Sequence, residues 1–122
     1  MARRMRQPTI YHNPRCSKSR ATLELLVACG FSPRVIEYLS SPPSVAEVER
    51  LLAMLGLEPR ELMRTDEDAY RDLGLADPGL TREQLVSAIA ANPRLLQRPI
   101  VVAGAKAAIG RPPEAVLAIL PD

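Results

Sequence analysis

Cys16 is the residue of this chain whose type and setting are best suited to chemistry. It follows a short predicted strand and directly precedes a predicted helix that begins at Ser17. The first backbone N–H groups of a helix have no partner inside it, and their dipoles favour an anion. Three cationic side chains lie close by in sequence, at Arg15, Lys18 and Arg20. Together these groups should lower the pKa of Cys16 and hold it as a thiolate nucleophile. The alternative is a cysteine that only packs or caps the helix.

The motif around Cys16 holds a single thiol, because Ser19 stands where a C-x-x-C oxidoreductase carries its second cysteine. The other cysteine, Cys29, comes 13 residues later on the same predicted helix, about 20 Å away at the helical rise per residue. Disulfide-bonded Cα atoms lie only about 4.4–6.8 Å apart. Cys29 therefore cannot resolve an adduct on Cys16, and its apolar neighbours predict a buried structural thiol. A one-cysteine mechanism requires an external thiol.

Three arginines are candidates for binding an anion beside that thiolate. Arg98 and Arg111 each precede a proline and flank a predicted β-hairpin, which would bring them together. Arg64 would have to reach in from a predicted helical segment. Planar guanidinium groups grip two oxygens of a tetrahedral oxyanion at once, and helix N-termini bind the same kind of ion. Each arginine alone is more typical of a solvated surface, so the interpretation depends on their combination with Cys16.

His12 is the only histidine of the chain and stands four residues before Cys16. It could lower the pKa of the thiol electrostatically, or it could simply pack at the end of the strand. Both readings stay open at the level of sequence. No metal-binding motif and no nucleotide-binding motif occurs, so no metal site is predicted.

The elements that must position these residues follow from periodicity and turn signals. Residues 9–13 read as a strand, 17–29 as a helix and 34–39 as a second strand, which together form a right-handed βαβ unit. Leu23, Leu26 and Val27 are expected on the inner face of that helix.

The middle of the chain, about 44–97, reads as a helical insertion. Capping boxes open helices at Ser44 and Thr81, and a further short helix fits 59–64. The polar stretch 66–79 reads as a loop.

Strand signals return at 99–103 and 106–109, joined by a two-residue turn at Gly104. A last helix starts at 112–114, with Val116, Leu117 and Leu120 on one side. The order βαβ, insertion, ββα is similar to the thioredoxin-like fold. We expect one α/β domain over 1–122, with a mixed four-stranded sheet and the insertion between its second and third strands.

Composition excludes several classes of protein. The net charge of +2, from 16 basic and 14 acidic residues, is too small for a strong nucleic-acid argument. No apolar run approaches the ~20 residues of a membrane span, and the basic start at 1–6 leads into no signal peptide. A cytoplasmic monomer is therefore expected, with no membrane or nucleic-acid partner.

The chain resembles the ArsC family, the arsenate reductases that depend on glutathione and glutaredoxin, as a member with a short C-terminal tail. Three motifs carry the resemblance, in the family's order: Ile10-Tyr11-His12-Asn13-Pro14-Arg15-Cys16-Ser17-Lys18-Ser19-Arg20, Arg98-Pro99-Ile100-Val101-Val102 and Gly110-Arg111-Pro112-Pro113-Glu114. The similarity runs from about residue 9 to 121 and implies a thioredoxin-like fold with a helical insertion.

The resemblance also implies a mechanism. Cys16 would attack arsenate, glutathione would bind the arsenic as a co-substrate, and glutaredoxin would complete the reduction to arsenite, without a tightly bound cofactor. The residue roles that it implies are oxyanion binding by Arg64, Arg98 and Arg111, activation of the cysteine by His12, and support by Ser19, Arg20 and a cis-proline at Pro99.

Two other functions stay open. The Spx branch of the same superfamily regulates transcription by binding RNA polymerase, but it typically carries a C-x-x-C switch that Ser19 removes. A glutathione-linked thiol–disulfide reductase would use the same thiolate on another substrate.

Overall fold

The computed structural model describes residues 7–121. The chain divides into two compact units, one formed by residues up to Tyr38 and from Arg98 onward, the other by Leu39–Gln97. The second unit falls close to the expected insertion at 44–97, while the single domain over 1–122 stays a prediction. The basic start at 1–6 lies outside the described residues. None of the helices between residues 7 and 121 is long and apolar enough to cross a membrane.

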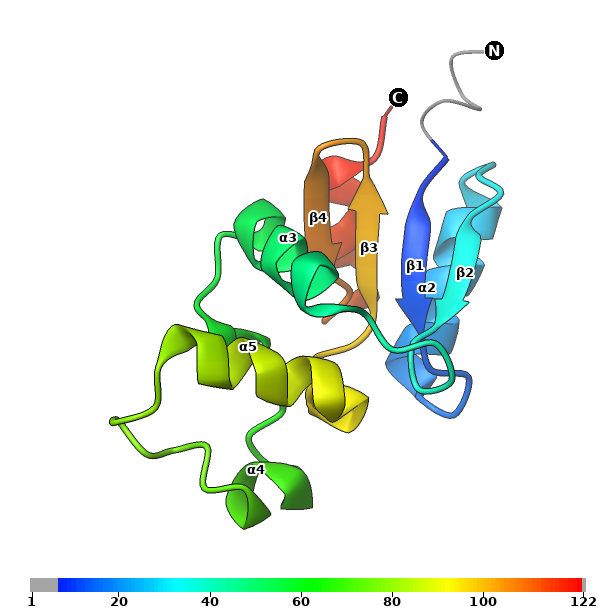
Figure 1. Cartoon of the computed structure of the whole chain (residues 1–122). Helices are drawn as coiled ribbons and strands as arrows, with labels where there is room; N and C mark the ends of the chain where they lie inside the picture. The colour runs from blue at the N-terminus through cyan, green and yellow to red at the C-terminus, as the bar shows by residue number, and fades with distance from the viewer. Residues whose placement is uncertain (1–6, 122) are drawn as a thin grey trace. The chain divides into compact units, whose positions relative to one another are not determined.

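The first unit contains a mixed four-stranded sheet with strand order β2-β1-β3-β4 (Figure 1). The strands are β1 (Thr9–His12), β2 (Arg34–Glu37), β3 (Ile100–Ala103) and β4 (Lys106–Ile109). β2 runs parallel to β1, whereas β3 runs antiparallel to both β1 and β4. This topology confirms the predicted α/β, thioredoxin-like arrangement.

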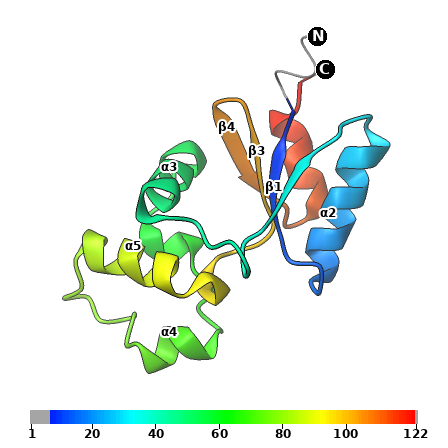
Figure 2. The same cartoon turned by 45° about the vertical axis from the view of Figure 1, so that its right-hand side comes forward.

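Two helical segments lie together on one face of this sheet, as Figure 2 shows. They are α2 (Ser17–Ala28) and the 3-10 helix η3 (Pro113–Ile119). The core between the two layers is aliphatic, as the scarcity of aromatic residues predicts. Its fully buried members are Ile10, Leu26, Val101 and Val116.

The register of the strands decides which loops meet. Tyr11 pairs with Ile100, and Ile100 pairs with Ile109. The end of β1, the start of β3 and the end of β4 therefore lie at one end of the sheet. The opposite end carries Arg34, which pairs with Thr9, and the hairpin turn that precedes Lys106. Gly104 occupies this turn with a φ of 63°, as expected for its first position.

Two predictions for α2 are wrong. Val27 is 58% exposed, because the buried face of α2 follows Ser19, Thr22 and Leu26, and the next residue along a helix points about 100° away. Cys29 is exposed as well, since it is the C-cap beyond Leu26, the last buried residue of α2. It is not a buried structural thiol.

The prediction that Val116, Leu117 and Leu120 share one side of the last helix is also wrong. The last helix is a 3-10 helix that opens at a double proline, and its tighter turn of three residues buries Val116 while leaving Leu117 45% exposed.

The named elements of the second unit are all helices. It comprises α3 (Val45–Leu55), η1 (Pro59–Leu62), α4 (Asp68–Asp72), α5 (Arg82–Ala91) and η2 (Pro93–Leu95). Both predicted capping boxes form, at Ser44 and at Thr81. The predicted short helix at 59–64 is a single 3-10 turn.

The reading of 66–79 as a loop is wrong in part, because it contains α4. This helix buries no residue, so it lacks the apolar periodicity that would reveal it. Arg60 holds the segment that follows, by donating hydrogen bonds to the carbonyl oxygens of Leu75 at 2.9 Å and Asp77 at 2.6 Å.

Candidate active site

Cys16 is the N-cap of α2, with extended backbone dihedrals (φ −95°, ψ 123°). Its N–H donates to the carbonyl of Asn13 at 2.9 Å, closing the turn after β1, and its own carbonyl accepts from the N–H of Arg20 at 3.0 Å. The thiol is buried. The backbone thus places the sulfur where the first N–H groups of the helix point, as the sequence predicts.

The electrostatic surroundings of Cys16 favour the thiolate. Burial by itself raises the pKa of the thiol, because it penalises the charged form. Four groups oppose this effect of burial and leave the pKa of Cys16 below its ordinary value. They are the backbone N–H groups of Ser19 and Lys18 and the guanidinium groups of Arg98 and Arg111. Among the groups that lower this pKa, the backbone N–H of Ser19 has the largest effect, followed by the guanidinium of Arg98.

Arg98 and Arg111 meet at the end of the sheet that carries Cys16. Nη2 of Arg111 lies 3.9 Å from Sγ of Cys16, and Nε of Arg111 donates to the carbonyl of Arg98 at 2.7 Å. Nε of Arg98 is buried and has no hydrogen-bond partner among the described residues. A buried donor left without an acceptor costs about 1–3 kcal/mol. The site therefore contains a guanidinium donor whose hydrogen-bonding capacity is unused among the described residues.

Two cis peptide bonds accompany these arginines. The Arg98–Pro99 bond is cis, as predicted, and so is the Arg111–Pro112 bond, which the sequence reading did not anticipate.

His12 and Ser19 form a buried side-chain pair. Nδ1 of His12 lies 2.6 Å from Oγ of Ser19, which also accepts a hydrogen bond from the N–H of Asn13 at 3.0 Å. Burial lowers the pKa of His12, the carboxylate of Glu37 raises it, and the guanidinium of Arg20 lowers it further. The net shift is downward, so the ring favours its neutral form. Whether His12 activates Cys16 stays a prediction.

Two of the predicted site residues have other partners in the structure. Arg20 donates to the carbonyl of Pro14 at 2.9 Å and so supports the loop between β1 and α2. Arg64 belongs to the second unit, where its guanidinium pairs with Glu67 at 2.9 Å and with Asp66 at 3.9 Å. Its role in anion binding stays a prediction.

The sequence reading missed a close packing contact that supports the site. A Cβ at Gly110 would lie 2.5 Å from Oγ1 of Thr22 and 2.8 Å from Cγ of Pro99. Thr22 is fully buried in α2, and Gly110 donates to the carbonyl of Pro99 at 2.9 Å. Gly110 thus allows the strand before Arg111 to approach the helix that begins at Cys16. The glycine directly before Arg111 was the available signal.

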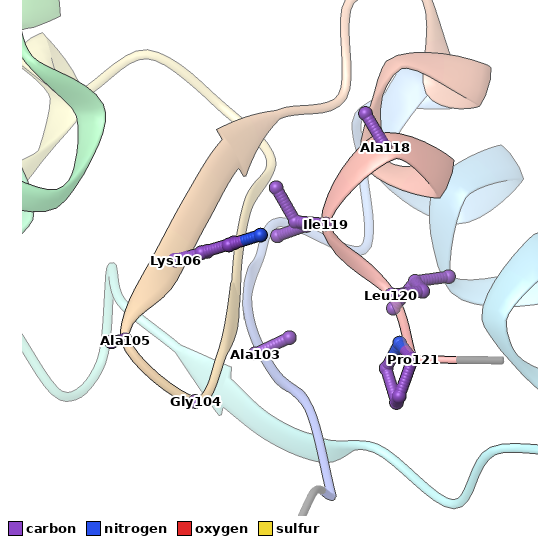
Figure 3. A pocket seen from close by; sticks show the side chains of 8 residues that line it. All are labelled: Ala103, Gly104, Ala105, Lys106, Ala118, Ile119, Leu120 and Pro121. Carbon is purple, nitrogen blue, oxygen red and sulfur yellow. The ribbon is translucent and has the colours of Figure 1, made fainter.

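A groove of about 340 Å³ at the opposite end of the first unit is a poorer candidate. It lies between the β3–β4 turn and the end of η3, and its lining is mostly apolar (Figure 3). Lys106 is its one charged lining residue. Within residues 7–121, no three His, Cys, Asp or Glu side chains gather in a way that could hold a metal ion.

Comparisons with known proteins agree with the geometry. A family model described as the ArsC family matches residues 11–119. The chain is 54% identical over 116 residues to the "Uncharacterized protein YfgD" of Escherichia coli K12, covering 94% of this chain and 98% of that protein. It is 49% identical over 112 residues to the "Arsenate reductase" of Neisseria meningitidis serogroup B, covering 91% and 96%. The structure of "Arsenate reductase from Vibrio cholerae" superimposes with a TM-score of 0.93 at 51% identity, covering 94% and 98%.

Proposed function

Because this chain belongs to the ArsC family, we propose that it reduces arsenate to arsenite through a covalent adduct on Cys16. The observation that supports this proposal best is the buried, unpartnered Nε of Arg98 beside a cysteine of lowered pKa. A tetrahedral oxyanion would accept from that donor and present its central atom to the sulfur. Arg111, at 3.9 Å from the same sulfur, would share the negative charge of the oxyanion.

The reaction requires two electrons and two thiols. The Cys16 thiolate attacks arsenic and displaces one arsenate oxygen, which leaves as water after protonation. Glutathione then binds the arsenic and displaces a second oxygen as water. The thiolate of glutaredoxin attacks the glutathione sulfur, forms a mixed disulfide and leaves the electron pair of the broken As–S bond on arsenic, which changes from the +5 to the +3 state. A water molecule finally displaces Cys16 and releases arsenite, so that one arsenate and two external thiols give one arsenite, one disulfide and one water. Arg98 and Arg111 would hold the anion against Cys16 during the attack, and the N–H groups at the start of α2 would stabilise the thiolate before it.

The second thiol must come from outside the first unit. Cys16 and Cys29 cap opposite ends of α2, about 20 Å apart at the rise of an α-helix. No disulfide can join them at that separation. In our proposal, glutathione supplies the thiol that binds the arsenic, and glutaredoxin supplies the thiol that completes the reduction to arsenite. The family resemblance is the reason for naming these two partners, and it likewise keeps His12 and Arg64 in the proposed site.

The direct test is an arsenate assay supplied with glutathione, glutaredoxin and a source of reducing equivalents. Arsenite should form with the wild-type chain and with Cys29→Ser, because Cys29 is exposed and remote from Cys16. Cys16→Ser should form none above background. Absence of arsenite with the wild-type chain, or full activity in Cys16→Ser, would contradict the proposal.

A second test separates this function from thiol–disulfide reduction. Arsenate or sulfate should protect Cys16 from alkylation in the Cys29→Ser protein, because the anion would occupy the space between Arg98, Arg111 and the sulfur. The protection should be lost in Arg98→Ala. An alkylation rate that neither anion changes would favour a thiol–disulfide enzyme instead.

A further inference from the structure

The two units of the chain differ sharply in charge. Within the described residues, the first unit contains seven basic and three acidic residues, a net charge of +4, whereas the second contains six basic and ten acidic residues, a net charge of −4. The salt bridges of Arg64, Arg71 and Arg82 all lie in the second unit. Within the described residues of the first unit, no carboxylate forms a salt bridge with the cations near Cys16.

The cations around Cys16 divide into two groups by what they contact. Arg98 and Arg111 act on the sulfur, and Arg20 is bound to the carbonyl of Pro14. Arg15 and Lys18 remain. Both are exposed, and neither side chain makes a hydrogen bond or ion pair within the described part of the chain.

These two residues flank the nucleophile on either side. Arg15 directly precedes Cys16, and Lys18 lies in the first turn of α2, where its N–H faces the sulfur. We call Arg15 and Lys18 the outer cations. In the proposed function, a small oxyanion would bind the buried Nε of Arg98, whereas exposed charges would contact the parts of a larger reactant that stay outside the site. Such charges raise the local concentration of anions and their rate of encounter.

We propose that the outer cations, Arg15 and Lys18, are specificity-determining residues that select an anionic thiol as the reactant that attacks the adduct on Cys16. This inference rests on the proposed function, in which an external thiol is required, and adds that the thiol is recognised by its negative charge. A peptide thiol with free carboxylates has the required chemistry. Neutral and cationic thiols of equal nucleophilicity are selected against.

The test uses a disulfide in place of the arsenic adduct, so that it needs no arsenate. In the Cys29→Ser protein, Cys16 is converted to its mixed disulfide with the neutral probe 2,2′-dithiodipyridine. An incoming thiolate attacks the Cys16 sulfur, forms a new S–S bond and expels pyridine-2-thiolate, which takes up a proton to give the coloured thione. The exchange consumes no further oxidant or reductant. Its rate is measured with mercaptosuccinate, glutathione, neutral 2-mercaptoethanol and cationic cysteamine, each expressed per thiolate present.

The wild-type outer cations should favour the anionic thiols over 2-mercaptoethanol, and added salt should reduce this preference. In Arg15→Ala/Lys18→Ala, the ratio of the mercaptosuccinate rate to the 2-mercaptoethanol rate should fall roughly 3- to 10-fold. In Arg15→Glu/Lys18→Glu, cysteamine should become the faster of the charged thiols. The ratio cancels any change in the reactivity of Cys16 itself, because both thiols attack the same disulfide.

A matched control removes the same charge elsewhere in the first unit. Arg34 and Lys106 lie at the opposite end of the sheet from Cys16, so Arg34→Ala/Lys106→Ala should keep the wild-type ratio, as should the charge-conserving Arg15→Lys/Lys18→Arg. A fall of this rate ratio in Arg34→Ala/Lys106→Ala would overturn the proposal. An unchanged ratio in Arg15→Ala/Lys18→Ala would overturn it as well.

Two further results keep the inference independent of the proposed function. If Arg15→Ala/Lys18→Ala does not fold, a wild-type preference that salt leaves unchanged would overturn the role of the outer cations. A chain that discriminates among thiols yet forms no arsenite would disprove the reductase proposal and leave this inference standing. A chain that reduces arsenate without discriminating among thiols would support the reductase proposal and overturn this inference.

Discussion

Arg111 and Cys16 are 95 positions apart in the sequence, yet Nη2 of Arg111 lies 3.9 Å from Sγ of Cys16. The same guanidinium donates through Nε to the carbonyl of Arg98. One side chain therefore joins the end of β4, the start of β3 and the N-terminus of α2. Because Arg111 also lowers the pKa of Cys16, its removal should affect the reactivity of the thiol before any substrate binds.

Arg111→Ala should raise the pKa of Cys16 and slow its alkylation near pH 7 by roughly 3- to 10-fold. The physical reason is that the thiolate loses a nearby positive charge and its population at neutral pH decreases. The measurement is the rate of iodoacetamide alkylation against pH in the Cys29→Ser protein. The mutant and parent rates should converge at high pH, where both thiols are ionised. Arg34→Ala serves as the control, and an identical pH profile for Arg111→Ala and the parent would contradict the role of Arg111.

The ring of His12 should titrate below the ordinary histidine pKa of about 6.5, because burial disfavours its charged form. As the only histidine, it gives a single set of ring signals in an NMR titration. Glu37→Gln should lower the pKa of His12 further, since Glu37 raises it, whereas Arg20→Ala should raise it. Shifts in the same direction for both variants would contradict this account of the electrostatics.

The same shift predicts how acid acts on folding. The unfolded chain takes up a proton on His12 at a higher pH than the folded chain does. The contribution of His12 to stability is therefore present above the ordinary pKa and is lost as the pH falls through the lowered pKa of the folded state. Urea unfolding over this range should show a smaller pH dependence in His12→Asn than in the wild-type chain. An equal dependence in the two proteins would count against the lowered pKa.

Gly110→Ala should destabilise the chain by about 1–3 kcal/mol, the usual effect of forcing an extra methyl group into a packed interior. The new Cβ would meet Oγ1 of Thr22 and Cγ of Pro99. Urea unfolding measures the change, and alkylation of Cys16 reports whether Arg111 has moved. Adding Thr22→Ala should recover part of the loss, because it removes one of the two clashing groups. Additive effects of the two substitutions would argue against the contact.

Arg60→Met should destabilise the second unit by about 1–2 kcal/mol, because two hydrogen bonds from the guanidinium to the carbonyls of Leu75 and Asp77 are lost while the apolar stem is kept. Limited proteolysis should show faster cleavage between residues 73 and 80. Arg50→Met, at an exposed position of α3, is the matched control. Equal cleavage in the two variants would mean that Arg60 does not hold this segment.

Local signals in the sequence predicted most of the elements. The capping boxes at Ser44 and Thr81, the position of Cys16 before a helix, and the turn at Gly104 all depend on residues close together in the chain. Such features are decided by backbone groups within one turn, so they can be read without a structure. The errors occurred where burial is set by distant partners, as for Val27, Leu117 and Cys29, or where a helix buries nothing, as for α4.

The sequence alone determined that Cys16 is the nucleophile candidate, that Ser19 leaves it without a resolving partner, and that an external thiol is needed. These conclusions depend on residue type and on spacing along one helix. Only the tertiary structure decided that Arg98 and Arg111 meet at Cys16, that Arg98 keeps a buried donor unpaired, and that Arg20 supports a loop. The approach of Arg98 and Arg111 to Cys16 follows from the pairing of β1 with β3, two segments about ninety residues apart, so no short stretch of sequence carries a signal for it. The bond from Arg20 to the carbonyl of Pro14 spans only six residues, but it depends on how the loop between β1 and α2 folds.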